Sequence, residues 1–256
     1  MLQNNFKNLL KNLRSKLLQI GSSKKCPVCE KSFLFFLPGG QDSKIFKELN
    51  VVGAGYRKNV VCPECFSIDR SRLLFLFVTR FIDIKSNKFK SILHVSPQYE
   101  FEEYMQALEG KEYISIDIMP KQAMLKMDLR NLDFQSDHFD LIICNHVIEQ
   151  IDDEQSCIDE MKRVLKGNGI IIMQAPIALN LPKTFESEIA LDNDSREKLY
   201  GQHDMLRIYG RDYAERIKLM GLNSKIISQE DFLDQEEQLT YGIDPRESVY
   251  IFYKNS

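Results

Sequence analysis

The sequence lacks several features that would place it in a specialised class of protein. It has no run of about eighteen apolar residues, so no segment is expected to span a membrane. The first apolar stretch is interrupted by lysines and lacks a cleavage-type end, which argues against a secretory signal. A formal net charge of −3 gives no general case for nucleic-acid binding. Six cysteines are too few for a disulfide scaffold, and four of them form two Cys-x-x-Cys pairs, which favours a reducing, cytoplasmic setting.

The chain has enough apolar residues for a sizeable core. At 256 residues and 43% hydrophobic content, it needs only one main domain and an appendage. We expect an amphipathic basic helix over residues 1–22, a zinc-binding module over 23–68 and an α/β domain over 69–256. The basic helix is expected to dock on its own domain or on a second subunit, and peripheral contact of residues 1–20 with an anionic membrane is the alternative.

Two motifs, CPVC and CPEC, are typical of zinc knuckles. Each can place two thiolates on one tetrahedral ion, because a two-residue gap turns the chain back on itself. Cys26, Cys29, Cys62 and Cys65 are therefore predicted to form a closed structural zinc site that keeps a small module folded. A redox pair or four unrelated buried cysteines is the alternative, and the two matching motifs disfavour it.

From residue 91 onward, apolar segments alternate with amphipathic ones. The predicted strands are SILHV (91–95), YISIDI (113–118), AMLKMD (123–128), FDLIICN (139–145), GIIIMQA (169–175), NSKIIS (223–228) and SVYIFYK (248–254). Helices are predicted over 67–84 and near 99–109, 152–166 and 211–220. This alternation indicates a Rossmann-like α/β fold: seven strands in a mostly parallel sheet, with helices on both faces. The last two strands are expected to pair antiparallel at the sheet edge.

Polar side chains at the strand ends suit a ligand site, because ligands of such sheets bind at the carboxyl ends of the strands. Asp117 could accept both hydroxyls of a ribose or cap the next segment. Asp128 could accept an adenine amino group or open a turn. Asn145 and His146 could face a ligand or cap the following helix. The loop after the first strand is Ser-Pro-Gln-Tyr, without the glycine that usually lets a cofactor approach the backbone.

The segment FDLIICNHVIEQIDDEQSCIDEMKRVLKGNGIIIMQAPI resembles class I S-adenosylmethionine-dependent methyltransferases of the type 11-like kind, in which the fourth strand ends in CNHVLEH and a helix leads into RVLKPGG. CPVC…CPEC…DRSRLLFLF, ILHVSP and YGQHDMLRIYGRDYAERI extend the likeness over nearly the whole chain after residue 25. They point to a subgroup with an N-terminal zinc-binding segment that carries four cysteines. In that subgroup the first strand commonly ends in LHFAPE, so the glycine-free loop is similar to a family variant.

The resemblance implies that S-adenosylmethionine contacts four strand ends. The implied cofactor residues are His94, Val95, Ser96 and Pro97 at the methionine end, Asp117 and Ile118 at the ribose and adenine, Asp128 and Leu129 at the adenine edge, and Asn145 and His146 near the sulfonium. The segment between QAPI and RIYGRDY would form a substrate lid. Its polar candidates for substrate contact are Glu186, Gln202, Asp204 and Arg207.

The chain departs from the subgroup at several positions. Ser71, Gln150 and Met205 stand where histidines are usual, and Gln98 stands for a glutamate. The implied activity is in-line methyl transfer to a small molecule or surface-glycan precursor, with His146 nominated as base. The alternatives are an inactive methyltransferase fold kept for binding, and an enzyme acting on nucleic acid or protein. The zinc module has few basic residues and no aromatic–basic interleaving, which counts against nucleic acid.

Overall fold

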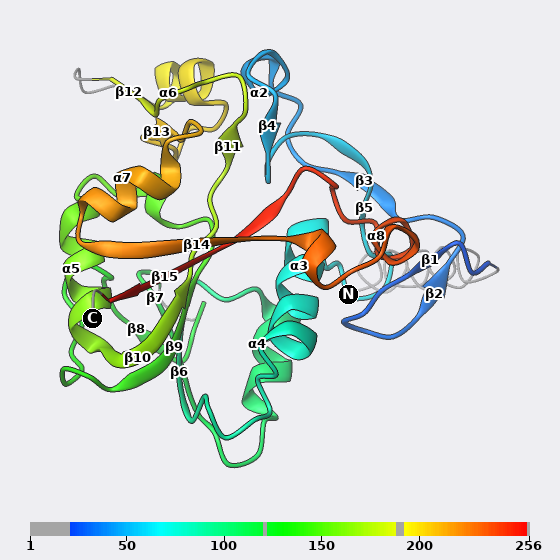
Figure 1. Cartoon of the computed structure of the whole chain (residues 1–256). Helices are drawn as coiled ribbons and strands as arrows, with labels where there is room; N and C mark the ends of the chain where they lie inside the picture. The colour runs from blue at the N-terminus through cyan, green and yellow to red at the C-terminus, as the bar shows by residue number, and fades with distance from the viewer. Residues whose placement is uncertain (1–20, 120–121, 188–191, 255–256) are drawn as a thin grey trace, which may run out of the picture.

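The centre of the protein is a seven-stranded sheet in the order β14-β15-β10-β9-β6-β7-β8 (Figure 1). The computed structural model describes residues 21–119, 122–187 and 192–254. The strands of the sheet are β6 (Ser91–Val95), β7 (Glu112–Asp117), β8 (Leu125–Lys126), β9 (Phe139–Cys144), β10 (Leu165–Ile172), β14 (Leu222–Ser228) and β15 (Ser248–Lys254). The five strands from β8 to β10 are parallel, and β15 runs antiparallel to both β10 and β14. This arrangement confirms the predicted Rossmann-like fold, including the antiparallel pair at the edge.

The direction in which strands are added reverses at β6. From β6 the chain builds outward through β7 to β8, and it then returns to place β9 on the other side of β6. All five residues of β6 are buried, as expected for a central strand covered on both faces. β8 is shorter than the predicted strand, and both of its residues are exposed at the sheet edge. The reversal at β6 creates a crevice at the carboxyl ends of β6 and β9.

Helices cover both faces of the sheet (Figure 1). One face carries α5 (Glu154–Val164) and α7 (Tyr213–Leu219), whose apolar residues share a core with β9 and β10. The other carries α3 (Asp69–Leu76), its π-helical continuation η1 (Phe77–Phe81) and α4 (Tyr99–Gln106). The predicted helices are therefore present, and Asp153 caps α5 by accepting a hydrogen bond from the Ser156 amide.

The cysteine module, residues 23–68, is built from short elements. These are β1 (Lys24–Lys25), β2 (Ser32–Phe33), β3 (Leu37–Gly39), α2 (Lys44–Glu48), β4 (Val51–Val52) and β5 (Arg57–Val61). β1 pairs with β2 and β3 with β5, both antiparallel. The four cysteines share a small core with Phe33 and Phe36. Such a core is too small to hold the module by itself, which is the situation that a structural metal resolves.

The cysteine module also packs on the lid segment, which the structure describes over residues 179–187 and 192–208. The lid contains β12 (Phe185–Glu186), α6 (Asn193–Tyr200) and β13 (Arg207–Ile208), and it follows β11 (Ile177–Ala178). β4 pairs with β11, and Phe46 of α2 shares a hydrophobic cluster with Tyr200 and Ile208. Figure 1 shows α2 and β4 beside α6 and β11. The module is thus one wall of the region around the lid.

Two of the remaining elements lie between the edge strands β14 and β15, and the third follows β9. The 3-10 turn η3 (Gln229–Asp231), the short 3-10 turn η2 (Ile148–Gln150) after β9, and α8 (Gln235–Tyr241) complete the described structure. No helix within the described ranges is long and apolar enough to cross a membrane. The predicted basic helix, placed mainly on residues 1–20, lies outside the described residues.

Candidate active site

A cavity of about 710 Å³ opens where the strand order reverses. Four strand ends form it: the residues after β6, β7, β8 and β9. The lid adds one wall with Arg196 and Leu206. The other lining residues are Val95, Ser96, Pro97, Asp117, Ile118, Met119, Gln122, Met127, Asp128, Leu129, Arg130, Val147, Gln150, Ile151 and Asp152. We call this cavity the crevice.

The first loop turns without a glycine because Ser96 adopts the left-handed conformation, with φ 52°. A non-glycine residue there costs about 1 kcal/mol or slightly more. Two hydrogen bonds hold the strained residue. Its amide donates to the Ile116 carbonyl over 2.8 Å, and its hydroxyl donates to the Asp117 carboxylate. The sequence therefore keeps the backbone path of a glycine loop while linking the first two strand ends.

Asp117 and Asp128 both reach the crevice and are both held in place. Oδ1 of Asp117 accepts the Met119 amide at 2.7 Å. Asp128 accepts bonds from the Arg130 guanidinium, which holds the pKa of that carboxyl below its usual range. Arg130 also donates to Asp152 across the crevice at 2.8 Å. Each carboxylate keeps further lone pairs that a ligand hydroxyl or amine could occupy.

His94 and Asn145 lie behind the crevice wall and do not line the cavity. His94 is buried, its Nδ1 lies 3.0 Å from the Tyr113 hydroxyl, and burial lowers its pKa to about 3. The Asn145 side chain accepts a hydrogen bond from the backbone amide of Gln174 at 2.9 Å. It also donates a hydrogen bond to the side-chain oxygen of Gln174 at 3.2 Å. These two residues brace the ends of β6 and β9 against their neighbours.

His146 and Glu149 point to the side of the same segment that does not line the crevice. The side chain of His146 is 7% exposed and that of Glu149 is 3% exposed. His146 Nδ1 lies 3.4 Å from Nη1 of Arg70 and 3.8 Å from Glu149 Oε1. His146 itself has φ 57°, a left-handed conformation that redirects the chain between β9 and the crevice.

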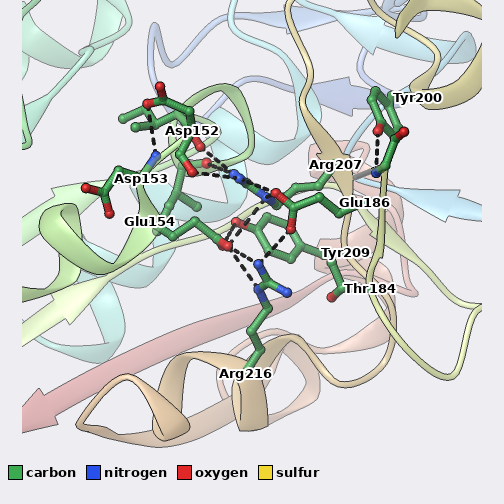
Figure 2. A network of polar contacts seen from close by, with 12 residues as sticks. Asp152, Asp153, Glu154, Thr184, Glu186, Tyr200, Arg207, Tyr209 and Arg216 are labelled. Atoms are coloured by element: carbon green, nitrogen blue, oxygen red, sulfur yellow. Dashed lines mark hydrogen bonds and ion pairs between the residues drawn. The ribbon is translucent and has the colours of Figure 1, made fainter. Parts of the chain in front are cut away.

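The lid is attached to the crevice wall mainly through Arg207 (Figure 2). This side chain is buried and donates to the carbonyls of Ile148, Ile151 and Asp152 at 2.9, 2.6 and 3.3 Å. It also pairs with Glu186 over 2.7 Å.

A second arginine completes this attachment from α7. Arg216 pairs with Glu186 of β12 and with the buried Glu154 of α5, and the Tyr209 hydroxyl donates to Glu154 (Figure 2). The lid, α5 and α7 thus meet in one network. Of the other predicted lid residues, Gln202 is half-buried and Asp204 is exposed, and neither lines the crevice.

The four predicted zinc ligands come together in the cysteine module. Their Sγ atoms all lie within 4.8 Å of one another. Cys26 Sγ lies 3.6 Å from Cys65 Sγ, and Cys29 Sγ lies 3.7 Å from Cys62 Sγ. Sulfurs bound to one tetrahedral zinc at about 2.3 Å are about 3.8 Å apart. The spacing therefore fits a closed zinc site without rearrangement.

The sequence-based reasoning missed several residues of the crevice, including Arg130, Gln122, Asp152 and Arg196. Arg130 and Asp152 had a usable signal, because Arg130 closely follows a predicted strand and Asp152 is the first residue of a predicted helix. Arg196 had none, since its place depends on how the lid folds back over the sheet.

Comparison with known proteins matches residues 87–173 to the family described as a methyltransferase domain. Among solved structures, the chain is similar to a SAM-dependent methyltransferase from Archaeoglobus fulgidus, with 15% identity and a TM-score of 0.45 over 71% of this chain and 93% of that one. It is also similar to the Burkholderia thailandensis 1,6-didemethyltoxoflavin-N1-methyltransferase, solved with its substrate and S-adenosylhomocysteine, with 11% identity and a TM-score of 0.44 over 72% and 78%. No protein of curated function matches the chain.

The family match runs from just before β6 to the end of β10, and so contains the strands that form the crevice. The chain therefore carries a methyltransferase domain, assigned over residues 87–173. A four-cysteine segment precedes this domain.

Proposed function

We propose that the protein transfers a methyl group from S-adenosylmethionine to a small molecule or surface-glycan precursor. The observation that carries this proposal is the crevice, which is formed by four successive strand ends at the reversal of strand order. Its volume of about 710 Å³ falls within the usual range of ligand pockets. Three acidic side chains, two arginines and several apolar side chains line it, which suits a nucleoside with a charged tail.

The crevice residues fit the cofactor at three places. Val95, Ser96 and Pro97 would hold the methionine end, where the left-handed Ser96 keeps the loop clear of the cavity. Asp117 would accept the ribose hydroxyls, since its oxygens are already oriented by the Ser96 hydroxyl and the Met119 amide. Ile118 is 57% exposed at the rim and would flank the adenine. An exposed apolar side chain there gains from being covered by a ring.

The adenine edge would meet the end of β8. Asp128 and Leu129 both line the crevice, and Arg130 fixes the orientation of the Asp128 carboxylate. His94 and Asn145 are proposed to act through the wall residues that they brace. When bound, the cofactor supplies an electrophilic methyl group, and the task of the protein is to exclude water and align the acceptor with that group.

The cysteine module is proposed to hold one structural zinc on Cys26, Cys29, Cys62 and Cys65. All four thiols are free, which supports a reducing, cytoplasmic compartment. We keep the proposed division at residues 1–22, 23–68 and 69–256, with the second and third parts joined by the β4–β11 pairing.

Calorimetric titration of the zinc-loaded protein with S-adenosylmethionine and S-adenosylhomocysteine tests the proposal. We expect micromolar binding, weakened about tenfold to a hundredfold in Asp117→Ala, because hydrogen bonds to a charged group contribute about 1.5 to 3 kcal/mol each. Asp133→Ala is the matched control, since Asp133 is exposed and outside the crevice. Equal binding by both variants, or no binding by the intact protein, would contradict the assignment of the site.

A further inference from the structure

Four polar side chains from three parts of the chain surround Gly53 of the cysteine module. They are Arg70 at the start of α3, His146 and Glu149 after β9, and Glu247 before β15, and we call them the buried polar cluster. Arg70 Nη1 donates to the Gly53 carbonyl at 2.6 Å. A side-chain carbon added to Gly53 would lie 3.1 Å from His146 Cε1 and 3.5 Å from Glu247 Oε1. Gly53 therefore covers the cluster so closely that a larger residue at this position would press against His146.

Each member of the buried polar cluster has one inaccessible polar atom without a hydrogen-bond partner among the described residues. The four atoms are Arg70 Nε, His146 Nε2, Glu149 Oε2 and Glu247 Oε2. An unpaired buried polar atom costs about 1 to 3 kcal/mol, so native proteins rarely gather four in one place. Partners that the chain does not supply are the simplest account, and these are buried water or a bound molecule that displaces it.

The contacts within the cluster decide which of these atoms donate. A guanidinium can only donate, so Nδ1 of His146, 3.4 Å from Arg70 Nη1, must be the accepting nitrogen. Burial and the charges of Arg70 and Arg57 hold the pKa of His146 well below its usual range, so the ring is neutral. Its proton therefore sits on Nε2. The cluster offers two unpaired N–H donors and two unpaired carboxyl oxygens, a set that a hydroxyl group matches because it both donates and accepts.

The cluster lies directly beside the crevice. Val147 and Gln150 line the crevice, while His146 and Glu149, their neighbours in the chain, belong to the cluster. The same cluster is joined to β10 by Gln174, whose side-chain nitrogen lies 3.4 Å from Glu247 Oε1. A small cavity of about 20 Å³ next to Glu247 and Gln174 has room for one group the size of water.

We propose that the buried polar cluster binds the reactive hydroxyl of a neutral, hydroxyl-bearing methyl acceptor, with Glu149 as the base. This inference rests on the proposed function and deepens it. Arg70 Nε and His146 Nε2 donate to the acceptor, and its hydroxyl donates to Glu149 Oε2. As the bond between the acceptor oxygen and the methyl carbon forms, the bond from that carbon to sulfur breaks and its electron pair stays on sulfur. The hydroxyl proton passes to Glu149. His146, already protonated on Nε2, serves as a donor.

Glu149 is favoured over Glu247 because it stands on the segment that lines the crevice. Burial raises the pKa of Glu149 to about 7, within the range in which a carboxylate works as a base at neutral pH. The charged groups facing it are Arg70 from α3, Arg207 from β13 and Asp204 from the lid, with the neutral His146 on its own segment. The cysteine module, through Gly53, thus forms part of the acceptor site.

The test uses the full-length, zinc-loaded protein saturated with S-adenosylhomocysteine. Saturation-transfer NMR would compare glucose, galactose, myo-inositol and glycerol as neutral probes with glucosamine as a cationic probe and glucose 6-phosphate as an anionic one. We expect a neutral probe to bind and Arg70→Met to weaken that binding at least tenfold. Glu215→Gln, on the exposed face of α7, should leave it unchanged.

The base is tested with the neutral probe that binds best. Glu149→Gln should bind it within about threefold of the intact protein, yet transfer the methyl group about a hundredfold or more slowly and lose the rise in rate near pH 7. Binding of the charged probes alone, binding of no probe, or an unchanged rate and pH profile in Glu149→Gln would overturn the inference. Absence of S-adenosylhomocysteine binding at the outset would instead overturn the proposed function on which it rests.

Discussion

Two buried arginines, Arg72 and Arg207, hold different regions of the molecule with the same kind of contact. Arg72 in α3 donates to the carbonyls of Val60 and Ser67 in the cysteine module and of Tyr241 and Gly242 at the end of α8. Arg207 in β13 donates to three carbonyls of the crevice wall. Both therefore tie together backbone segments of separate elements, Arg72 around the four cysteines and Arg207 around the crevice.

The two arginines differ in what balances their charge. Arg207 pairs with the carboxylates of Glu186 and Glu154. Arg72 has no carboxylate within ion-pair distance in the described structure, and it lies over the Phe36 ring at 4.2 Å. Burial lowers the pKa of Arg72, while the charges of Asp69 and of the nearby cysteine sulfurs raise it. Four thiolates on a zinc ion leave two net negative charges, so the proposed metal site would add to the counter-charge that Asp69 provides for Arg72.

Loss of the metal should have the largest effect. Cys62→Ser, or removal of zinc by a chelator, is expected to unfold the cysteine module, since structural zinc contributes on the order of 10 kcal/mol. Thermal unfolding followed by circular dichroism, with zinc measured by mass spectrometry, checks this. Cys157→Ser, which alters a buried cysteine outside the module, is the control. A chain that keeps its melting temperature without zinc would refute a structural role for the metal.

Arg207→Met should affect both stability and the crevice. It leaves the buried Glu154 with Arg216 as its remaining cationic partner, and loss of one member of a buried pair costs about 3 to 5 kcal/mol. The wall from Ile148 to Asp152 also loses its donor, so we expect S-adenosylhomocysteine to bind about tenfold more weakly. Denaturant unfolding and calorimetry measure the two effects, and a variant that loses stability but keeps full affinity would show that the wall does not depend on Arg207.

Arg72→Met should lower the stability of the protein without weakening the crevice, and so distinguish the effects of the two regions. It leaves four carbonyls without their donor and is expected to cost about 3 kcal/mol in unfolding free energy. Because none of these carbonyls belongs to the crevice, affinity for S-adenosylhomocysteine should stay within about twofold. The same denaturant and calorimetric measurements apply. A large loss of affinity in this variant would mean that the cysteine module controls the crevice more strongly than its contacts indicate.

His94 extends the comparison to a buried group with no counter-charge. Burial lowers its pKa to about 3, so between pH 6.5 and 3 the unfolded chain binds a proton that the folded chain does not. Its contribution to stability is therefore lost as the pH falls, by about 2 kcal/mol between pH 7 and 5. The difference in unfolding free energy between the intact protein and His94→Gln should therefore change by about 2 kcal/mol when the pH is lowered from 7 to 5. An unchanged difference would show that His94 is not buried in the neutral form.

The parts of the fold that the sequence predicts are those set by local pattern. The strands of the sheet follow from continuous apolar runs, and the zinc ligands follow from two matched Cys-x-x-Cys motifs. Asp117 and Asp128 were predictable at the site because a strand end fixes where its last side chain lies. The conformation of the glycine-free loop is a local feature that could not be predicted, since only the structure shows that Ser96 takes the left-handed conformation.

The parts that escaped prediction depend on contacts between distant segments. Arg207 was predicted as a substrate residue, and the structure places it in the network that fastens the lid, because its partners lie more than fifty residues earlier in the chain. The β4–β11 pairing and the position of Gly53 over His146 are likewise set by how the cysteine module docks. Two-residue strands carry no periodicity from which such docking could be read.

Hydrogen exchange of the zinc-loaded protein with and without S-adenosylhomocysteine tests the central claim most directly. We expect the cofactor product to slow exchange at the four strand ends that form the crevice, residues 95–97, 117–119, 128–130 and 147–152, with little change in β14 or β15. Exchange that is unaffected at these four places, or slowed only within the cysteine module, would contradict the assignment of the crevice as the cofactor site.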